Sequence, residues 1–166
     1  MRILRVARAA ALVLAIAGFA ACTFTSKDSS QEVQDAVRAY FDAVNRADPT
    51  AIMSQYSRKA EATSVFEGDI VRGWDQIRRE TDKMAGTAGE EKWAPGTMEV
   101  LFLGHDHALV VVPVNITLRS STGHDELEGA STLVMEKVDG KWVILHEHHS
   151  VKPADDEDES YDSRRS

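Results

Sequence analysis

The chain has 166 residues, of which 43% are hydrophobic and 28% are charged, a size and composition typical of one globular domain. Its formal net charge is -8, so nucleic acid is excluded as an expected partner, because phosphate binding needs a basic surface. The single cysteine excludes an internal disulfide, and no Cys/His spacing indicates a structural zinc site. We therefore assign no metal and no cofactor.

Residues 1–21 predict a signal for export. Three arginines precede an apolar run, 9–21, that is too short to span a bilayer, since a spanning helix needs roughly 20 residues. The sequence Phe19-Ala20-Ala21-Cys22 resembles the cleavage box of bacterial lipoproteins, although that box usually begins with leucine. An ordinary secretory signal with an incidental cysteine is the alternative. The lipoprotein interpretation predicts acylation of Cys22, palmitate included, and a lipid-anchored, extracytoplasmic location in the bacterial cell envelope.

Three helices are expected in the first half of the chain. The first begins at Ser29, which has capping-box spacing to Glu32 and precedes apolar residues at helical intervals. Asp48 followed by proline predicts a short second helix over 49–56, and a third begins at Trp74 and ends near Gly86 and Gly89.

Strands are expected between these helices and throughout the second half. The predicted strands are 62–66, 70–72, 98–103, 108–119, 127–138 and 141–151. Short links between the later strands predict an antiparallel meander, and Trp93 is expected in a polar loop. Trp142 and Trp74 are expected in the core.

The last strand is the most informative stretch. Asp139-Gly140 is the residue pair that a type I′ hairpin turn favours, and it predicts that Met135 lies beside Ile144 and Ser131 beside His148. The residues expected on the inner face are Trp142, Ile144, His146, His148 and Ser150, and those expected on the other face are Val143, Leu145, Glu147 and His149.

Particular residues along the chain suggest a family. The matching segments are Tyr40-Phe41-x-Ala43-Val44-Asn45-x-x-Asp48, Gly73-Trp74-x-x-Ile77, Thr132-Leu133-Val134 and Gly140-Lys141-Trp142-x-Ile144-x-His146-x-His148-x-Ser150. This pattern resembles the SnoaL-like branch of the nuclear transport factor 2-like superfamily. The resemblance implies an α+β fold: a cone-shaped, curved antiparallel sheet wrapped around N-terminal helices (a cystatin-like α+β roll), with a cavity between them and often dimerisation. The domains expected are a signal peptide (1–21), a tether (22–28), a SnoaL-like domain (29–152) and an acidic disordered tail (153–166).

Comparison with ketosteroid isomerase, a member of that superfamily, bears on catalysis. Tyr40 lies where the resemblance would place the tyrosine of that enzyme's oxyanion hole. The position of the carboxylate base falls on Thr63 or Ser64, and neither can take a proton from carbon without activation. Ketosteroid isomerisation is therefore disfavoured, and a core aromatic is the simpler interpretation of Tyr40.

We expect His148 to be the polar centre of the cavity. The candidate ligand-binding residues are Tyr40, Trp74, Ser131, Trp142, His146 and His148, with His148 also the one candidate catalytic residue. A metal site at the two strand histidines is the less favoured alternative, because its third ligand cannot be chosen among Glu99, Asp106 and His124. His105 and His107 are expected in an exposed turn.

Three classes of function remain open. We favour a lipid-anchored envelope protein whose cavity binds a small, partly apolar molecule without catalysing a reaction, and which forms a homodimer. The second class is an enzyme of isomerase, cyclase or hydrolase-like type with His148 as acid or base, and the third is a homo-oligomerisation module. An acidic residue beside the cavity histidine would favour the second class, and a long apolar outer sheet face would favour the third.

Overall fold

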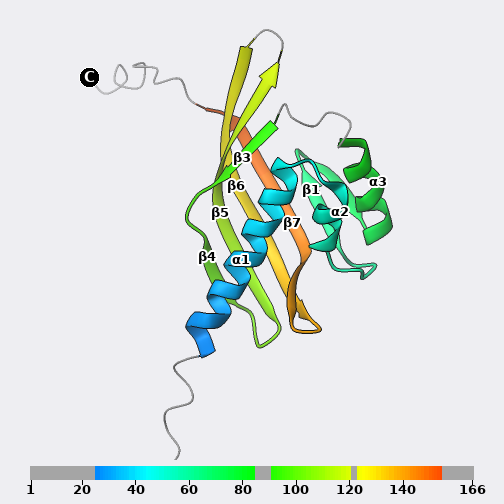
Figure 1. Ribbon diagram of the computed structural model, residues 1–166, viewed down its shortest axis with the longest axis vertical. Coiled ribbons are helices and arrows are strands. Elements are labelled where there is room, and N and C mark those ends of the chain that lie inside the picture. Colours follow the sequence, from blue (N-terminus) through cyan, green and yellow to red (C-terminus); the bar gives the residue numbers. More distant parts are fainter. Residues whose placement is uncertain (1–24, 85–90, 121–122, 155–166) are drawn as a thin grey trace, which may run out of the picture.

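The computed structural model describes residues 25–84, 91–120 and 123–154, and it confirms the α+β class (Figure 1). The elements in chain order are α1 (Thr25–Asn45), α2 (Pro49–Ser54), β1 (Thr63–Phe66), β2 (Asp69–Arg72), α3 (Trp74–Met84), β3 (Glu91–Pro95), β4 (Glu99–Phe102), β5 (His107–Ser120), β6 (Gly123–Val138) and β7 (Lys141–Pro153). The predicted signal peptide, Cys22, the acidic run after 154, Gly86 and Gly89 lie outside the described residues. Within the described residues, no helix is both long and apolar enough to cross a membrane.

Helix α1 begins at Thr25, four residues before the predicted start at Ser29. Residues 25–28 contain neither proline nor glycine, so nothing stops the helix there, and α1 includes them. The buried side of α1 carries Val33, Val37 and Phe41 at intervals of four residues. The long apolar face of α1 therefore packs onto the sheet.

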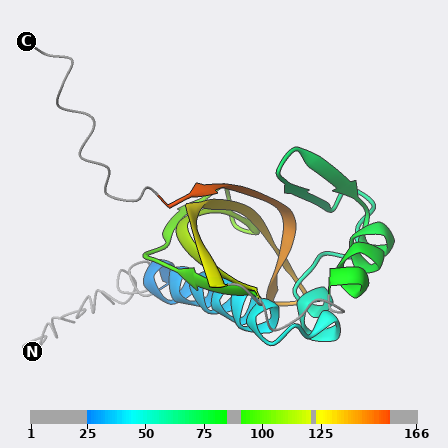
Figure 2. The same ribbon diagram turned by 90° about the horizontal axis from the view of Figure 1, so that it is seen from above.

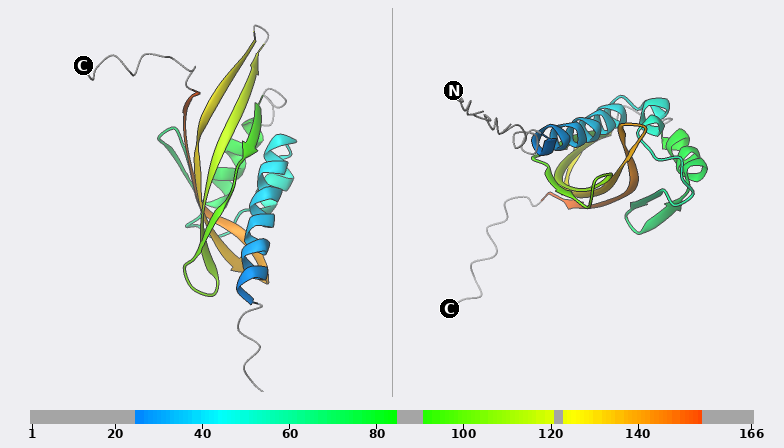
Figure 3. Two further views of the ribbon diagram at one scale, coloured as in Figure 1. Left: turned by 90° about the vertical axis from the view of Figure 1, so that its left-hand side faces the viewer. Right: turned by 90° about the horizontal axis from the view of Figure 1, so that it is seen from below.

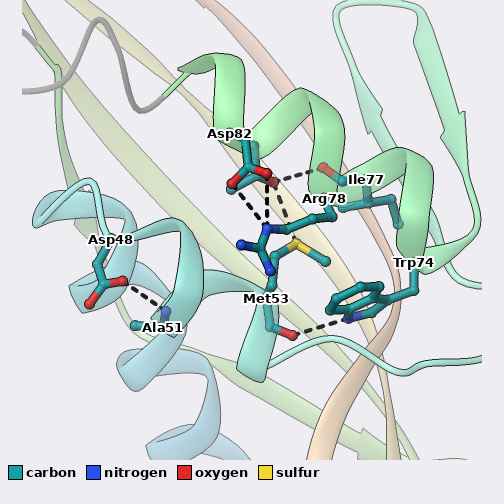
Figure 4. Close-up of polar contacts among 8 residues, drawn as sticks. Asp48, Ala51, Met53, Trp74, Ile77, Arg78 and Asp82 are labelled. Atoms are coloured by element: carbon teal, nitrogen blue, oxygen red, sulfur yellow. Dashed lines mark hydrogen bonds and ion pairs between the residues drawn. The ribbon is translucent and has the colours of Figure 1, made fainter.

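Helices α2 and α3 pack against each other beside the end of α1 (Figure 4). Asp48 caps α2 as predicted, because its Oδ1 accepts a hydrogen bond from the amide of Ala51 at 2.9 Å. The indole Nε1 of Trp74 donates to the carbonyl of Met53 at 3.3 Å, and the Thr81 hydroxyl lies 3.6 Å from the Met53 sulfur. These contacts attach the start and middle of α3 to α2.

The strands form one curved, unclosed sheet of seven strands in the order β2-β1-β7-β6-β5-β3, with β4 also pairing with β5. All pairs are antiparallel except β1 with β7, where Thr63 pairs with His146 and Val65 with His148. The sheet is therefore mixed, not purely antiparallel as predicted. Seen from above, it curves around an interior that α1 crosses on one side, while α2, α3 and the β1–β2 hairpin gather at the end of α1 (Figure 2). The views from the side and from below show the same arrangement (Figure 3).

Strand β3 was not expected from the sequence, and it places Trp93 in the core instead of in a loop. The side-chain amide of Asn45, at the end of α1, bonds to both backbone groups of Trp93: Oδ1 accepts from its amide at 2.7 Å and Nδ2 donates to its carbonyl at 2.8 Å. Trp93 is 8% exposed, and its ring packs against that of Phe41. A short strand with alternating polar residues is thus fixed by a contact from a distant helix.

Candidate ligand-binding cavity

The hairpin of β6 and β7 holds one extra residue that decides which side chains face the interior. The predicted type I′ turn is present, with φ of 50° at Asp139 and 79° at Gly140. The predicted pairing of Met135 with Ile144 is also present, but Val134 then pairs with His146, so Leu145 is a bulge on β7. From there to its end, β7 presents the opposite set of side chains to the interior.

The expected position of His148 is therefore wrong. His148 is exposed, whereas Glu147 and His149 are buried, with 3% and 4% of their surfaces exposed. Ser131 lies opposite His149 and not opposite His148. The turn was interpreted correctly, and the bulge at Leu145 reversed the alternation beyond it.

A cavity of about 400 Å³ lies between the sheet and the helices, within the range typical of small-molecule sites. Its apolar lining residues are Val44, Ala47, Ile52, Phe66, Val71, Ile77, Met84, Trp93, Leu118 and Leu127. Its polar lining residues are Tyr40, Tyr56, Ser64, Glu67, Glu80, Thr81, Glu91, Glu147 and His149. The walls are thus mainly aliphatic and aromatic, with a small set of groups able to ionise.

The carboxylate of Glu147 is the centre of the polar cluster. Its Oε1 accepts hydrogen bonds from the Tyr56 hydroxyl and, at 2.7 Å, from the Ser64 hydroxyl. Its Oε2 lies 3.2 Å from Nε2 of His149, within ion-pair distance. Within the described residues, no donor is aligned for a hydrogen bond to this buried Oε2. Oε1 of Glu147 therefore accepts two hydrogen bonds, whereas the neighbour of Oε2 is the imidazole of His149.

The imidazole of His149 is fixed from two sides. The hydroxyl of Ser131, which is fully buried, lies 2.6 Å from Nδ1 on the side away from Glu147. The ring also packs edge-on against Trp93, with ring centroids 5.0 Å apart, and lies 6.3 Å from the ring of Phe66. Ser131, His149 and Glu147 thus form a continuous polar chain that ends in the cavity.

Burial and neighbouring groups shift the pKa values of the Glu147 carboxyl and of the two tyrosine hydroxyls in opposite directions. Burial favours the neutral form of Glu147, but the nearby imidazole of His149 and the hydrogen bonds from Tyr56 and Ser64 outweigh it and lower the pKa of Glu147 to about 2. Burial, followed by the negative charge of Glu147, raises the pKa values of Tyr40 and Tyr56 well above 10. At neutral pH the site therefore holds an ionised carboxylate and two protonated phenols.

The other predicted site residues are divided between the cavity and distant places. Tyr40 lines the cavity, and its ring meets that of Tyr56 edge-on with centroids 6.0 Å apart. Trp142 is buried at the other end of β7, beside Phe102, and lines no part of the cavity. His146 is half-buried outside the lining, on the β7 segment that pairs with β1.

Trp74 is half-buried and lines a separate surface hollow instead of the cavity. That hollow contains Arg58 and Arg72, and the guanidinium of Arg58 lies 4.2 Å above the Trp74 ring. Trp74 is therefore placed where it stabilises the junction of α2 and α3, away from the proposed ligand.

Among the cavity residues that could not be predicted from the sequence are Glu147, His149, Tyr56 and Trp93. The buried carboxylate of the cavity is thus Glu147, on the last strand, and Ser64 on the first strand donates a hydrogen bond to it. The sequence offers no local signal for Glu147, because a glutamate on the outer face of a strand is an ordinary solvated residue. Within the described part of the chain, no group of three or more acidic, histidine or cysteine side chains is placed to hold a metal ion, so the alternative of a metal at His146 and His148 finds no third ligand there.

Comparisons with known proteins agree with this architecture. The profile of the SnoaL-like domain matches residues 33–154. Among curated proteins, none matches the chain. A nuclear transport factor 2-like protein of unknown function from Shewanella oneidensis is 27% identical, with a TM-score of 0.60 over 74% of this chain and 98% of that one.

Two further solved structures share the fold at low identity. A candidate scytalone dehydratase from Novosphingobium aromaticivorans is 15% identical, with a TM-score of 0.70 over 78% of this chain and 88% of that one. The association domain of CaMKII from C. elegans is 19% identical, with a TM-score of 0.64 over 76% of this chain and 98% of that one. The chain therefore belongs to the SnoaL-like domain family and has the nuclear transport factor 2-like fold.

Proposed function

We propose that this protein binds a small, mostly apolar molecule in the cavity, with the polar end of that molecule directed to the cluster around Glu147. The observation that carries the proposal is an ionised carboxylate buried at the wall of a largely apolar cavity, with one oxygen for which no donor is aligned among the described residues. A buried carboxylate oxygen of this kind is stabilised by any ligand group that donates a hydrogen bond to the cluster. Aliphatic and aromatic walls favour an apolar body for the rest of the ligand.

Native mass spectrometry of the purified protein tests this proposal. Leu127 is half-buried and lines the cavity, so Leu127→Trp should fill the cavity and displace a bound molecule. Leu101 is 60% exposed on β4, away from the cavity, and Leu101→Trp is the matched control. We expect a co-purified or added small molecule on the wild type and on Leu101→Trp, and none on Leu127→Trp. Equal occupancy of all three proteins would place the ligand elsewhere.

The proposal includes attachment to the cell envelope through a lipid on Cys22. Its support is the arginine-rich start, the apolar run and the small residues that precede the only cysteine of the chain. Acyl chains on one terminus would suffice to hold an acidic domain at a bilayer. The cavity would then sample molecules outside the cytoplasm.

We also propose a homodimer formed through the outer face of β4 and β5. Leu101 pairs with Leu109 on the face opposite to the core, and Val111, on the same face, is 38% exposed. Grouped exposed aliphatic residues on a sheet indicate a contact surface. The CaMKII neighbour is by its name an association domain, which is compatible with assembly through this fold.

A second candidate function is acid–base catalysis in the same cavity, with His149 as the group that carries the proton. The specific observation in its favour is the chain from the Ser131 hydroxyl through His149 to Glu147, at 2.6 and 3.2 Å, which orients an imidazole as catalytic dyads do. One structural neighbour is by its name a candidate dehydratase. If the wild type converts a bound ligand and His149→Gln binds that ligand without converting it, the protein is an enzyme and not a binding protein alone.

A further inference from the structure

The cavity lining is acidic, and this limits the charge of its ligand. Four glutamates line it, Glu67, Glu80, Glu91 and Glu147, and the described lining residues include no lysine and no arginine. Glu80 is neutralised from outside by Lys83 at 3.0 Å, and Glu147 faces His149. Among the residues that the structure describes, no lysine, arginine or histidine forms an ion pair with Glu67 or Glu91. An anionic ligand would therefore be repelled.

Two of these carboxylates are linked to each other and to Tyr40 through side chains of the cavity wall. Trp93, which donates to Glu91, packs edge-on against His149, and His149 lies 3.2 Å from Glu147. Tyr56, which donates to Glu147, meets the Tyr40 ring edge-on. In keeping with this arrangement, burial and then the negative charges of Glu147 and Glu91 raise the pKa of Tyr40. Glu91 is half-buried, and its Oε1 accepts a hydrogen bond from Nε1 of Trp93 at 2.7 Å, which fixes the carboxylate at the wall. The space beside Tyr40 is thus flanked by two fixed negative charges, one of them on the buried Glu147.

The polar group that the ligand should carry is specified by Glu147. Its side chain is more than nine-tenths buried, it lines the cavity, and its Oε2 has no aligned hydrogen-bond donor within the described residues. An ammonium group carries donors only, whereas a hydroxyl also presents an acceptor to the carboxylates. The cluster therefore matches a donor that is also positively charged.

The apolar walls suit the same class of ligand. The rings of Phe66 and Trp93 lie with their centroids 6.4 Å apart, and both line the cavity. Aromatic faces attract organic cations as well as apolar groups. A cavity of 400 Å³ has the volume of on the order of a dozen water molecules, which sets a similar number of heavy atoms for the ligand.

From this arrangement we infer that the ligand is an organic amine, with its ammonium group beside Tyr40 between Glu91 and Glu147 and its apolar body between the aromatic walls. This inference rests on the proposed binding function and specifies its ligand class. The inference predicts that, among molecules of the same shape, the protein binds a cation more tightly than a neutral molecule or an anion.

Three probes of nearly equal size test the inference: 4-phenylbutylamine, 4-phenylbutan-1-ol and 4-phenylbutanoate. We expect calorimetric titration of the full-length protein at pH 7 to give an affinity for the amine about tenfold above that for the alcohol, and weakest binding for the carboxylate, because charge attraction is strong at a partly buried site. Glu91→Gln keeps the shape of the side chain and should reduce the preference for the amine several-fold while leaving the alcohol unchanged. Glu99→Gln, on the exposed side of β4, is the control and should bind as the wild type does.

Glu147→Gln provides a second variant at the buried side of the site, and circular dichroism establishes that each variant is folded. Loss of the preference for the amine in either folded variant, with the alcohol still bound, supports the inference. Equal or tighter binding of the alcohol by the wild type overturns the inference and leaves the binding function in place. Failure of all three probes to bind at millimolar concentration overturns the proposed function and the inference with it.

Discussion

The Glu147 carboxylate should make the stability of the protein depend on pH in acid. Its folded-state pKa of about 2 lies below the ordinary value of 4.5, so the unfolded chain binds this proton more readily than the folded chain does. At about 1.36 kcal/mol for each unit, the difference corresponds to about 3 kcal/mol of stability at neutral pH. This contribution is fully present above about pH 5.5 and is lost as the pH falls through 4.5 toward 2, with about 2 kcal/mol lost at pH 3.

Urea denaturation of the wild type and of Glu147→Gln between pH 6 and pH 3 measures this effect. The Gln side chain cannot ionise, so the variant lacks this component of the pH dependence, whatever its stability at pH 6. Glu99→Gln, altered at an exposed carboxylate, should follow the wild type. The free energy of unfolding of the wild type should therefore fall about 2 kcal/mol further than that of Glu147→Gln. Parallel curves for the two proteins would refute the account of a buried, ionised Glu147.

Three further predictions concern the core, the polar chain and the N-terminus. Trp93→Ala and Trp142→Ala should each cost about 3–5 kcal/mol in chemical denaturation, and Trp74→Ala less, because only the first two side chains are buried. Trp74→Ala as costly as the other two would contradict this ranking. Ser131→Ala removes the partner of the buried imidazole and should cost about 1–3 kcal/mol in the same assay, while an unchanged unfolding midpoint would show that the contact is not formed. Cys22→Ser should abolish incorporation of labelled fatty acid, and absence of label from the wild type would exclude the lipoprotein interpretation.

The helices and the main hairpin could be predicted because each depends on local chemistry. Asp48 caps α2 by a contact three residues along the chain, and Asp139-Gly140 adopts the positive φ values that a type I′ turn requires. The overall architecture could be predicted from the resemblance to the SnoaL-like pattern, because that pattern consists of short segments whose helix or strand structure is set locally.

The features that could not be predicted depend on distant contacts. Strand β3 is held by the Asn45 amide, 48 residues from Trp93 in sequence, so its short polar pattern carries no local signal. The parallel pairing of β1 with β7 is likewise non-local. The bulge at Leu145 inserts one residue into a strand whose two faces are both apolar at that point, and hydrophobic alternation cannot detect it. One residue was enough to exchange the predicted cavity histidine, His148, for His149.

The bulge at Leu145 turns Glu147 and His149 into the cavity, and nuclear Overhauser spectroscopy of histidine and tryptophan ring protons can test this arrangement. The ring centroids of His149 and Trp93 are 5.0 Å apart, close enough for strong cross-peaks between their protons. His148 is exposed and should show no cross-peak to Trp93. Cross-peaks from His149 to Trp93 are the predicted result, and cross-peaks from His148 to Trp93 in their place would contradict the register on which the site is built.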